Sequence, residues 1–164
     1  MKQMIYADNA ATTKLDIEAF EAMKVYLLND YANSSQPYSF SRAAKKALKN
    51  ARQTIAECIN AEPEEIFFTS GGSESDNWAI KGIAQHENSG KIVVSAIEHH
   101  AILRSCAELE RAGNKIEYIK PNSDGIVTAG CLATHISGKI KLVSVMLVNN
   151  ELGTVQPIKE LSAI

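Results

Sequence analysis

Several features that mark other classes of protein are missing from this chain of 164 residues. No stretch approaches the roughly 18 consecutive apolar residues that a membrane-spanning helix needs. A net charge of -2 and a pI near 6.1 give no general attraction to nucleic acid or to an anionic membrane. Cysteines are few, odd in number and far apart, so neither a disulfide framework nor a zinc site is indicated; they are Cys58, Cys106 and Cys131.

The first twenty residues also lack the apolar segment of a secretory signal peptide, since they carry Asp8, Lys14, Asp16 and Glu18. We therefore expect a reducing, cytoplasmic setting and no membrane partner. What the chain does have is 45% hydrophobic and 22% charged residues, a balance typical of a folded globular protein. Its length is sufficient for one domain with a substantial core.

Short apolar runs that suit buried strands alternate with segments of helical periodicity. The expected strands lie at 66–69, 91–96, 115–119 and 141–148. The expected helices cover about 16–29, 40–60, 76–84, 101–113 and 158–164. Strands separated by helices of this length favour right-handed crossovers and a parallel sheet with helices on both faces, which is an α/β fold.

Three of the expected strands run directly into small polar clusters. The clusters are Ser70-Gly71-Gly72-Ser73-Glu74, Glu98-His99-His100 and Asn149-Asn150-Glu151. The carboxyl ends of parallel strands lie at one edge of a sheet, where open α/β sheets bind their ligands. We therefore expect the three clusters to converge on one crevice.

The first cluster offers a phosphate-binding arrangement. Gly71 and Gly72 permit close approach of the backbone, and Ser73 stands where the free N–H groups of the next helix point outward. The segment has neither the Gly-Lys-Ser/Thr ending of a P-loop nor a G-x-G-x-x-G pattern, so a nucleotide is not favoured. A plain helix cap preceded by a glycine turn remains the alternative.

The other two clusters offer an imidazole and an amide. His99 and His100 are neighbours whose side chains should diverge, and no third ligand is evident, so we expect no metal site. One imidazole could stack on an aromatic ligand or move a proton, or it could be purely structural. Asn150 could donate a hydrogen bond to a ligand oxygen, with Asn149 as the structural residue of the pair.

Four stretches resemble the cysteine desulfurases, which are fold-type I pyridoxal-phosphate enzymes of the class V aminotransferase group. They are "YADNAATT" (6–13), "IFFTSGGSESDNWAIKG" (66–82), "SAIEHHAIL" (95–103) and "VNNELGTVQPI" (148–158). The resemblance runs through the whole chain in the order and spacing of the family. It implies a partial parallel sheet flanked by helices, the first part of the large cofactor-binding domain.

The resemblance also implies roles for individual residues. Gly72 and Ser73 would hold the phosphate of pyridoxal 5'-phosphate, and Asn150 would reach the phenolic oxygen of that cofactor. His99 would stack on the pyridine ring and act as a catalytic residue. Asn33 would lie near the substrate. No metal is implied.

The chain departs from the family in two respects. In the loop at 33–40 and directly after it, serine and tyrosine replace residues usual in the family; the departures are Ser34, Tyr38 and Ser41. Family members are also considerably longer. The Schiff-base Lys, in its Ser-x-His-Lys context, and the persulfide Cys have no counterpart here, nor do the Asp that pairs with the cofactor ring and the Arg that binds the substrate carboxylate. We therefore expect an amino-terminal portion, in which 1–15 would join the small domain and 16–164 form an incomplete large domain.

For the whole enzyme, the resemblance implies removal of sulfur from L-cysteine to give alanine and an enzyme persulfide. The sulfur would pass to an acceptor or scaffold protein for iron–sulfur clusters or tRNA thiolation, and the full-length enzyme would be a homodimer without direct nucleic-acid contact. The chain alone is expected to be inactive and to bind the cofactor weakly or not at all. The alternatives are a portion of a selenocysteine lyase or another class V transaminase, and a non-catalytic remnant with an interaction role.

Overall fold

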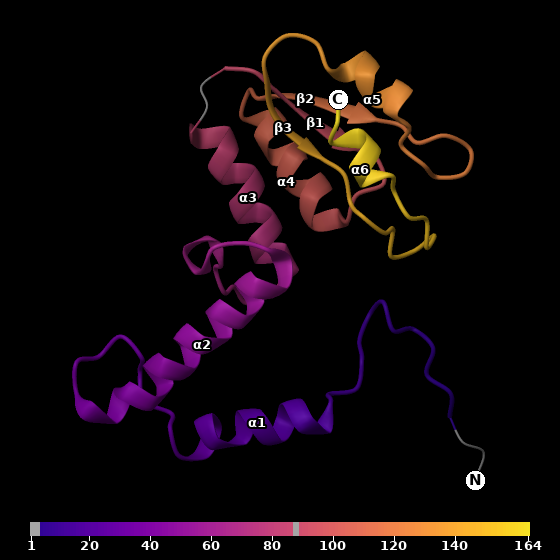
Figure 1. Ribbon diagram of the computed structural model, residues 1–164. Coiled ribbons are helices and arrows are strands. Elements are labelled where there is room, and N and C mark those ends of the chain that lie inside the picture. The colour runs from indigo at the N-terminus through magenta and orange to yellow at the C-terminus, as the bar shows by residue number, and fades with distance from the viewer. Residues whose placement is uncertain (1–3, 87–88) are drawn as a thin grey trace. The chain divides into compact units, whose positions relative to one another are not determined.

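The computed structural model describes residues 4–86 and 89–164. The chain forms two compact units, Met1–Phe68 and Thr69–Ile164, which are described separately below (Figure 1). The domain division that we expect after residue 15 stays a prediction, and its residues 1–3 lie outside the described part of the chain.

The first unit is helical, as the sequence predicts. It contains α1 (Ile17–Leu28) and α2 (Arg42–Ile59), with short 3-10 turns at Ser39–Ser41 and Pro63–Glu65. Helix α1 begins after Asp16, whose carboxylate accepts the N–H of Glu18 at 2.8 Å and that of Ala19 at 3.2 Å. This is the usual N-cap, which satisfies donors that the first helical turn leaves free.

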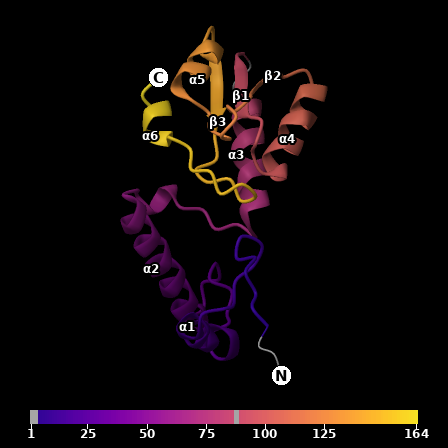
Figure 2. The same ribbon diagram turned by 90° about the vertical axis from the view of Figure 1, so that its right-hand side faces the viewer.

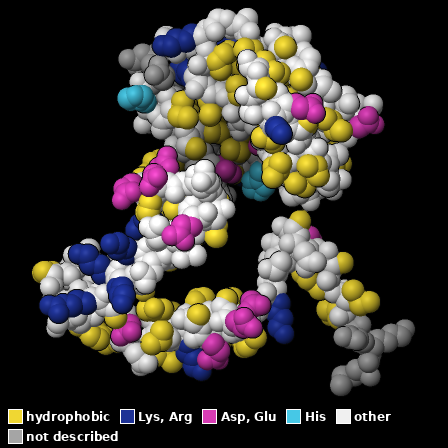
Figure 3. Space-filling model, in the orientation of Figure 1, with side chains coloured by type: hydrophobic (Ala, Val, Ile, Leu, Met, Phe, Trp, Pro, Cys, Tyr) yellow, Lys and Arg dark blue, Asp and Glu magenta, His cyan; other side chains and the backbone are white. Residues whose placement is uncertain are grey.

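Helix α2 has two different faces. Small and aliphatic residues recur at helical spacing on one face, where Leu48 and Ile55 lie. The opposite face carries most of the basic residues of the helix, and Figure 3 shows dark blue Lys and Arg side chains gathered along α2. The helix is therefore amphipathic, as its periodicity predicts.

The segment 66–69, which we expect to be a strand, is extended but pairs with no strand among the described residues. Its groups bind to α2 instead: Arg52 donates from Nε to the Ile66 carbonyl at 3.0 Å and stacks over the Phe68 ring at 5.1 Å. The prediction was wrong because an apolar run shows only that a segment suits a strand. It does not show that another strand lies beside it.

The second unit is built on a parallel sheet. Its strands are β1 (Lys91–Ser95), β2 (Lys115–Ile119) and β3 (Ile140–Ser144), in the order β2-β1-β3. Both pairings of the central β1 are parallel, which confirms the α/β class, but the sheet has three strands rather than the four predicted. β3 also ends earlier than expected, because Val148 forms an antiparallel bridge with Val155 instead of extending the strand.

Helices cover both faces of this sheet (Figure 2). On one face lie α3 (Gly72–His86) and α4 (His100–Arg111), and on the other α5 (Ala129–His135) and α6 (Ile158–Leu161). Each face of the sheet has its own hydrophobic core, and successive side chains of β1 alternate between the two. Ile92 and Val94 pack with α3 and α4, whereas Val93 packs with α5 and α6. This burial on both faces explains why β1 is apolar almost throughout. Among the described residues, the longest helices are too short or too polar to cross a membrane.

Candidate functional site

Helices α3 and α4 lie side by side and run parallel. Asn77 of α3 accepts from the Ser105 hydroxyl of α4 at 2.8 Å, and one turn further Lys81 bonds to Glu108 at 2.7 Å. The two links follow the same direction along both helices, so the amino-terminal ends of α3 and α4 lie at the same end of the pair. The positive ends of their helix dipoles therefore lie close together.

The start of α3 presents free backbone donors. In the described residues, no protein acceptor meets the N–H groups of residues 72–74, as expected of a first helical turn. A Cβ added at Gly71 or Gly72 would meet no atom within 4 Å, so the space beside this backbone is open. Donors that face open space at a helix start are suited to bind an anion.

Glu74 places a negative charge on the same turn. Its carboxylate accepts both the N–H and the hydroxyl of Ser70 at 2.6 Å. These two bonds hold the pKa of Glu74 below its usual range. An anion bound to the 72–74 donors would therefore be close to a carboxylate that stays ionised, because the Ser70 bonds stabilise its charge without removing it.

His99 is the N-cap of α4. Its Nδ1 accepts the backbone N–H of Ala101 at 3.1 Å, so the hydrogen of the neutral ring is on Nε2. The neighbouring His100 ring lies 6.3 Å away, centroid to centroid, at an angle of 55°. Both imidazoles line the same two cavities described below, so the expected divergence of their side chains stays a prediction. Among the described residues, no group of His, Cys, Asp and Glu side chains could hold a metal ion.

One cavity lies beyond the carboxyl ends of β1 and β3. It has a volume of about 250 Å³, and residues from the second and third polar clusters line it, including Glu98, His99, Asn149 and Asn150. Two of the three clusters therefore converge as predicted. We call this space the His99 cavity.

A second cavity lies between α3 and α4 and shares His99 and His100 with the first. Its lining includes Ser73, Asn77, His100 and Arg104. The first polar cluster thus reaches His99, but through α3 packing beside α4 rather than through a strand of the sheet. We call this space the α3–α4 cavity.

Sequence reasoning missed two residues of the α3–α4 cavity. Asn77 lies one helical turn after Ser73 and donates to its carbonyl at 2.8 Å, and Arg104 lies one turn after His100. The signal that could have found both is helical spacing, since residues at i and i+4 lie on the same face of a helix.

Asn33 lies in the first unit. Its side-chain oxygen accepts the N–H of Ser35 at 3.0 Å and the hydroxyl of Ser35 at 2.9 Å, which makes a tight polar turn. The expected place of Asn33 near a substrate stays a prediction.

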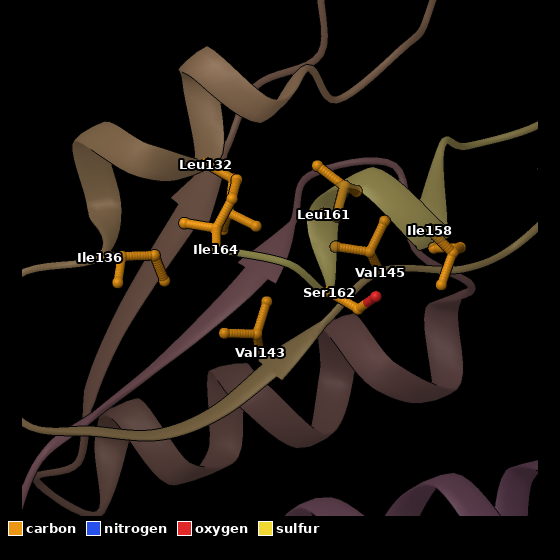
Figure 4. Close-up of a pocket in the computed structure, with 8 residues that line it drawn as sticks. All are labelled: Leu132, Ile136, Val143, Val145, Ile158, Leu161, Ser162 and Ile164. Atoms are coloured by element: carbon orange, nitrogen blue, oxygen red, sulfur yellow. The ribbon is translucent and has the colours of Figure 1, made fainter.

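An apolar groove on the other face of the sheet has a different character (Figure 4). Seven aliphatic side chains and one hydroxyl line it; they are Leu132, Ile136, Val143, Val145, Ile158, Leu161, Ile164 and Ser162. With one hydroxyl as its only polar side chain, this groove offers no acid, base or anion-binding group.

The residues around His99 fit pyridoxal 5'-phosphate. Free N–H groups beside open space suit its phosphate, the flat imidazole of His99 suits an aromatic ring, and the Asn150 amide can donate to a ring oxygen. When bound, this cofactor supplies an electron sink for reactions at the α-carbon of an amino acid.

Known proteins similar to this chain have related names. It is 43% identical to the cysteine desulfurase IscS of Clostridium botulinum strain Hall over 166 residues, which cover 100% of the chain and 42% of that protein. It is 45% identical to the cysteine desulfurase IscS of Methanosarcina thermophila, covering 98% of the chain and 40% of the relative. The chain thus spans about two fifths of the length of these relatives.

Two solved structures share the fold. The NifS-like protein superposes with a TM-score of 0.91 at 34% identity, over 95% of this chain and 43% of the other. The structure described as SspA in complex with cysteine superposes with a TM-score of 0.92 at 39% identity, over 96% of this chain and 46% of the other. Residues 5–164 match the family described as Aminotransferase class-V, and the chain belongs to that family.

Proposed function

We propose that this chain is the amino-terminal part of a pyridoxal-phosphate-dependent cysteine desulfurase. The observation that carries the proposal is that His99, together with its neighbour His100, lines both the cavity of Asn150 and the cavity of Ser73. A planar ring that carries a phosphate needs an aromatic side chain to stack on, an anion-binding group on one side of that side chain and a hydrogen-bond donor to the ring substituent on the other. The relatives named cysteine desulfurase support the choice of reaction.

Each residue then has a stated task. The N–H groups of Gly72 and Ser73 bind the phosphate at the positive end of the α3 dipole. The His99 imidazole lies against the pyridine ring, with its orientation fixed by the Ala101 N–H. Asn150 donates from its amide to the phenolic oxygen.

The whole protein would take L-cysteine as substrate, leaving alanine and a persulfide on a cysteine thiolate. The sulfur would pass to an acceptor or scaffold protein for iron–sulfur cluster assembly or tRNA thiolation. We also propose a cytoplasmic homodimer for the full-length enzyme. We further propose that Asn33 lies near the substrate in the active site of that enzyme.

The test is a pair of titrations followed by NMR of the backbone amides. Inorganic phosphate should shift the signals of residues 71–74, whereas pyridoxal 5'-phosphate should shift those and also His99 and Asn150. Pyridoxal without its phosphate should bind more weakly. If both ligands shift only signals elsewhere, the glycine turn is simply a helix cap and the proposal is wrong.

A matched pair of variants adds specificity. Asn150→Ala should weaken pyridoxal 5'-phosphate about fivefold, because a neutral hydrogen bond contributes about 1 kcal/mol. It should leave inorganic phosphate unaffected. Asn50→Ala removes an exposed amide on α2 and should change neither affinity.

A further inference from the structure

The segments that follow β1 and β3 are joined by two side-chain hydrogen bonds beyond the end of the sheet. Glu98 accepts the backbone N–H of Met146 through Oε1 at 2.5 Å. In the opposite direction, Asn149 donates from Nδ2 to the Ile97 carbonyl at 2.9 Å. We call this pair of bonds the Glu98–Asn149 clasp.

Each clasp residue immediately precedes a proposed cofactor contact. Glu98 is 8% exposed and Asn149 is 7% exposed, whereas the next residues, His99 and Asn150, are exposed. All four line the His99 cavity. The same arrangement therefore occurs on both sides of that cavity: a buried side chain that bridges, followed by an exposed side chain that faces a ligand space.

Glu98 makes its bridge with a buried carboxylate. Oε1 also accepts the Ser95 hydroxyl at 3.1 Å, so one oxygen connects the last residue of β1 to the segment after β3. No Lys or Arg in the described part of the chain forms an ion pair with Glu98. Burial raises the pKa of Glu98, because removing the carboxylate from water disfavours its charged form.

Asn149 uses both ends of its amide. While Nδ2 reaches Ile97, Oδ1 accepts the N–H of Glu151 at 2.9 Å and that of Leu152 at 2.8 Å. The backbone of Asn149 closes the same turn by bonding to Thr154 and Gly153, both at 2.9 Å. Asn150 thus stands at the tip of a turn whose base is tied to the end of β1.

We propose that Glu98 and Asn149 are positioning residues, which set the separation between the His99 imidazole and the Asn150 amide to match the cofactor ring. The ladder between β1 and β3 ends at Val94 and Ser144, so the sheet itself does not fix that separation. The clasp does so across the next few residues. This inference rests on the proposed function, because it assigns the two exposed residues to one ligand.

The proposal is about reach rather than charge, and two conservative variants separate the two properties. Glu98→Gln keeps the length of the side chain and an oxygen that can accept from Met146, but it removes the charge. Glu98→Asp keeps the charge and shortens the reach by one carbon–carbon bond. Asn149→Ala, which removes the other half of the clasp, serves as an independent variant.

The experiment measures three quantities for each variant: the dissociation constant of pyridoxal 5'-phosphate, that of inorganic phosphate, and the circular dichroism induced in the absorption band of bound pyridoxal 5'-phosphate. Glu98→Gln should bind pyridoxal 5'-phosphate within about threefold of the wild type and keep the induced signal. Glu98→Asp and Asn149→Ala should bind it at least tenfold more weakly and lose most of that signal. Inorganic phosphate should bind all variants within twofold, because residues 72–74 lie on α3.

The possible failures are distinct. Of the two expectations for the chain alone, weak cofactor binding or none, the proposed function commits to weak binding. A wild-type chain that binds no pyridoxal 5'-phosphate would therefore overturn the proposed function and this inference with it. Wild-type binding that Glu98→Asp and Asn149→Ala leave unchanged would overturn the clasp alone. So would a Glu98→Gln variant that is impaired while Glu98→Asp is not, since charge and not reach would then be the property that matters. Thermal unfolding of each variant identifies any variant that loses binding because it is unfolded. A folded variant that loses both phosphate and cofactor binding would also contradict the positioning role of Glu98 and Asn149.

Discussion

The amide of Asn77 bridges two helices: its oxygen lies 2.8 Å from the Ser105 hydroxyl of α4, and its nitrogen donates to the Ser73 carbonyl at 2.8 Å. Ser105 is 2% exposed, so this bond is shielded from water. The contact aligns the first turn of α3 with α4. It thereby connects the predicted phosphate donors to His99.

We predict that Asn77→Ala lowers the free energy of unfolding by about 1–2 kcal/mol, the range for losing a buried hydrogen bond. The Ser105 hydroxyl keeps the Ala101 carbonyl at 2.8 Å as an acceptor, which limits the loss. The free energy of unfolding can be measured by urea unfolding. The reporter is the fluorescence of the single tryptophan, Trp78, which is the residue after Asn77 on α3. Asn50→Ala is the exposed control, and equal stabilities for the two variants would contradict the prediction.

The carboxylate of Glu117 makes stability depend on pH. The Lys91 ammonium at 2.7 Å is the main cause that lowers the pKa of Glu117 from 4.5 to about 2, with smaller contributions from His135 and Lys115. A carboxyl whose pKa is lowered by folding stabilises the fold above its unfolded pKa and loses that contribution as the pH falls through the folded value.

Glu117→Gln should therefore cost stability at pH 6 and less at each step down from about pH 4.5 to pH 2. Urea midpoints for the wild type and the variant should converge over that window. Glu160→Gln, which alters an exposed carboxylate on α6, should leave the pH profile unchanged. A Glu117→Gln curve parallel to the wild type from pH 6 to pH 2 would contradict the assignment.

The cysteines should differ in reactivity. Burial raises the pKa of the Cys106 thiol to about 11, whereas Cys58 is exposed on α2. Because the thiolate is the reactive form, a disulfide reagent at pH 8 should modify Cys58 at least about tenfold faster than Cys106. Cys58→Ser should abolish the fast phase and Cys106→Ala should leave it intact, and mass spectrometry of the labelled peptides identifies the sites.

Two glycines should respond oppositely to alanine. Gly90 precedes β1 with φ of +109°, and a Cβ there would lie 2.9 Å from the Lys139 carbonyl oxygen. Gly90→Ala should therefore destabilise the fold by roughly 1–3 kcal/mol. Gly130 lies in α5 with no atom within 4 Å of its added Cβ, so Gly130→Ala should stabilise by about 0.5–1 kcal/mol. Thermal unfolding of both variants measures the two effects. Melting temperatures that shift in the same direction for both variants would contradict the prediction.

The chain should have no desulfurase activity of its own. None of its lysines lies in a Ser-x-His-Lys context, and from the resemblance to the cysteine desulfurases we expect that none of its cysteines is the persulfide cysteine. Without those groups neither covalent step of the reaction can occur. Incubation with L-cysteine and pyridoxal 5'-phosphate, compared with the same mixture lacking protein, should release no additional alanine or sulfide.

The strands of the sheet and the helices α3, α4 and α6 could be predicted from periodicity. β2 matches its expected bounds of 115–119, and β1 differs by a single residue at its end. Segment 66–69 could not be judged in this way, because pairing depends on what lies beside a strand rather than on its own sequence. In the structure Phe67 is 64% exposed and Phe68 is 47% exposed, although both suit a buried strand.

The candidate site was predictable where it depends on topology alone. His99 and Asn150 follow parallel strands, so their convergence follows from the α/β pattern. The contact between Asn77 and Ser105 joins residues 28 apart in the chain, and the bond from Met146 to Glu98 joins residues 48 apart. Such contacts depend on how helices and loops pack, for which a single sequence carries no local signal.

The central position of β1 also determines the order in which the second unit can assemble. One edge of β1 pairs with β2, and the connection between these two strands contains only α4. The other edge of β1 pairs with β3, and the connection between β1 and β3 contains α4, β2 and α5. Closing that longer loop costs more entropy and slows the step that completes the sheet. Until then one edge of an apolar strand is open to pairing with other chains. Assembly from the amino-terminal side therefore exposes β1 longest, and its protection from hydrogen exchange should be complete only after β3 has docked.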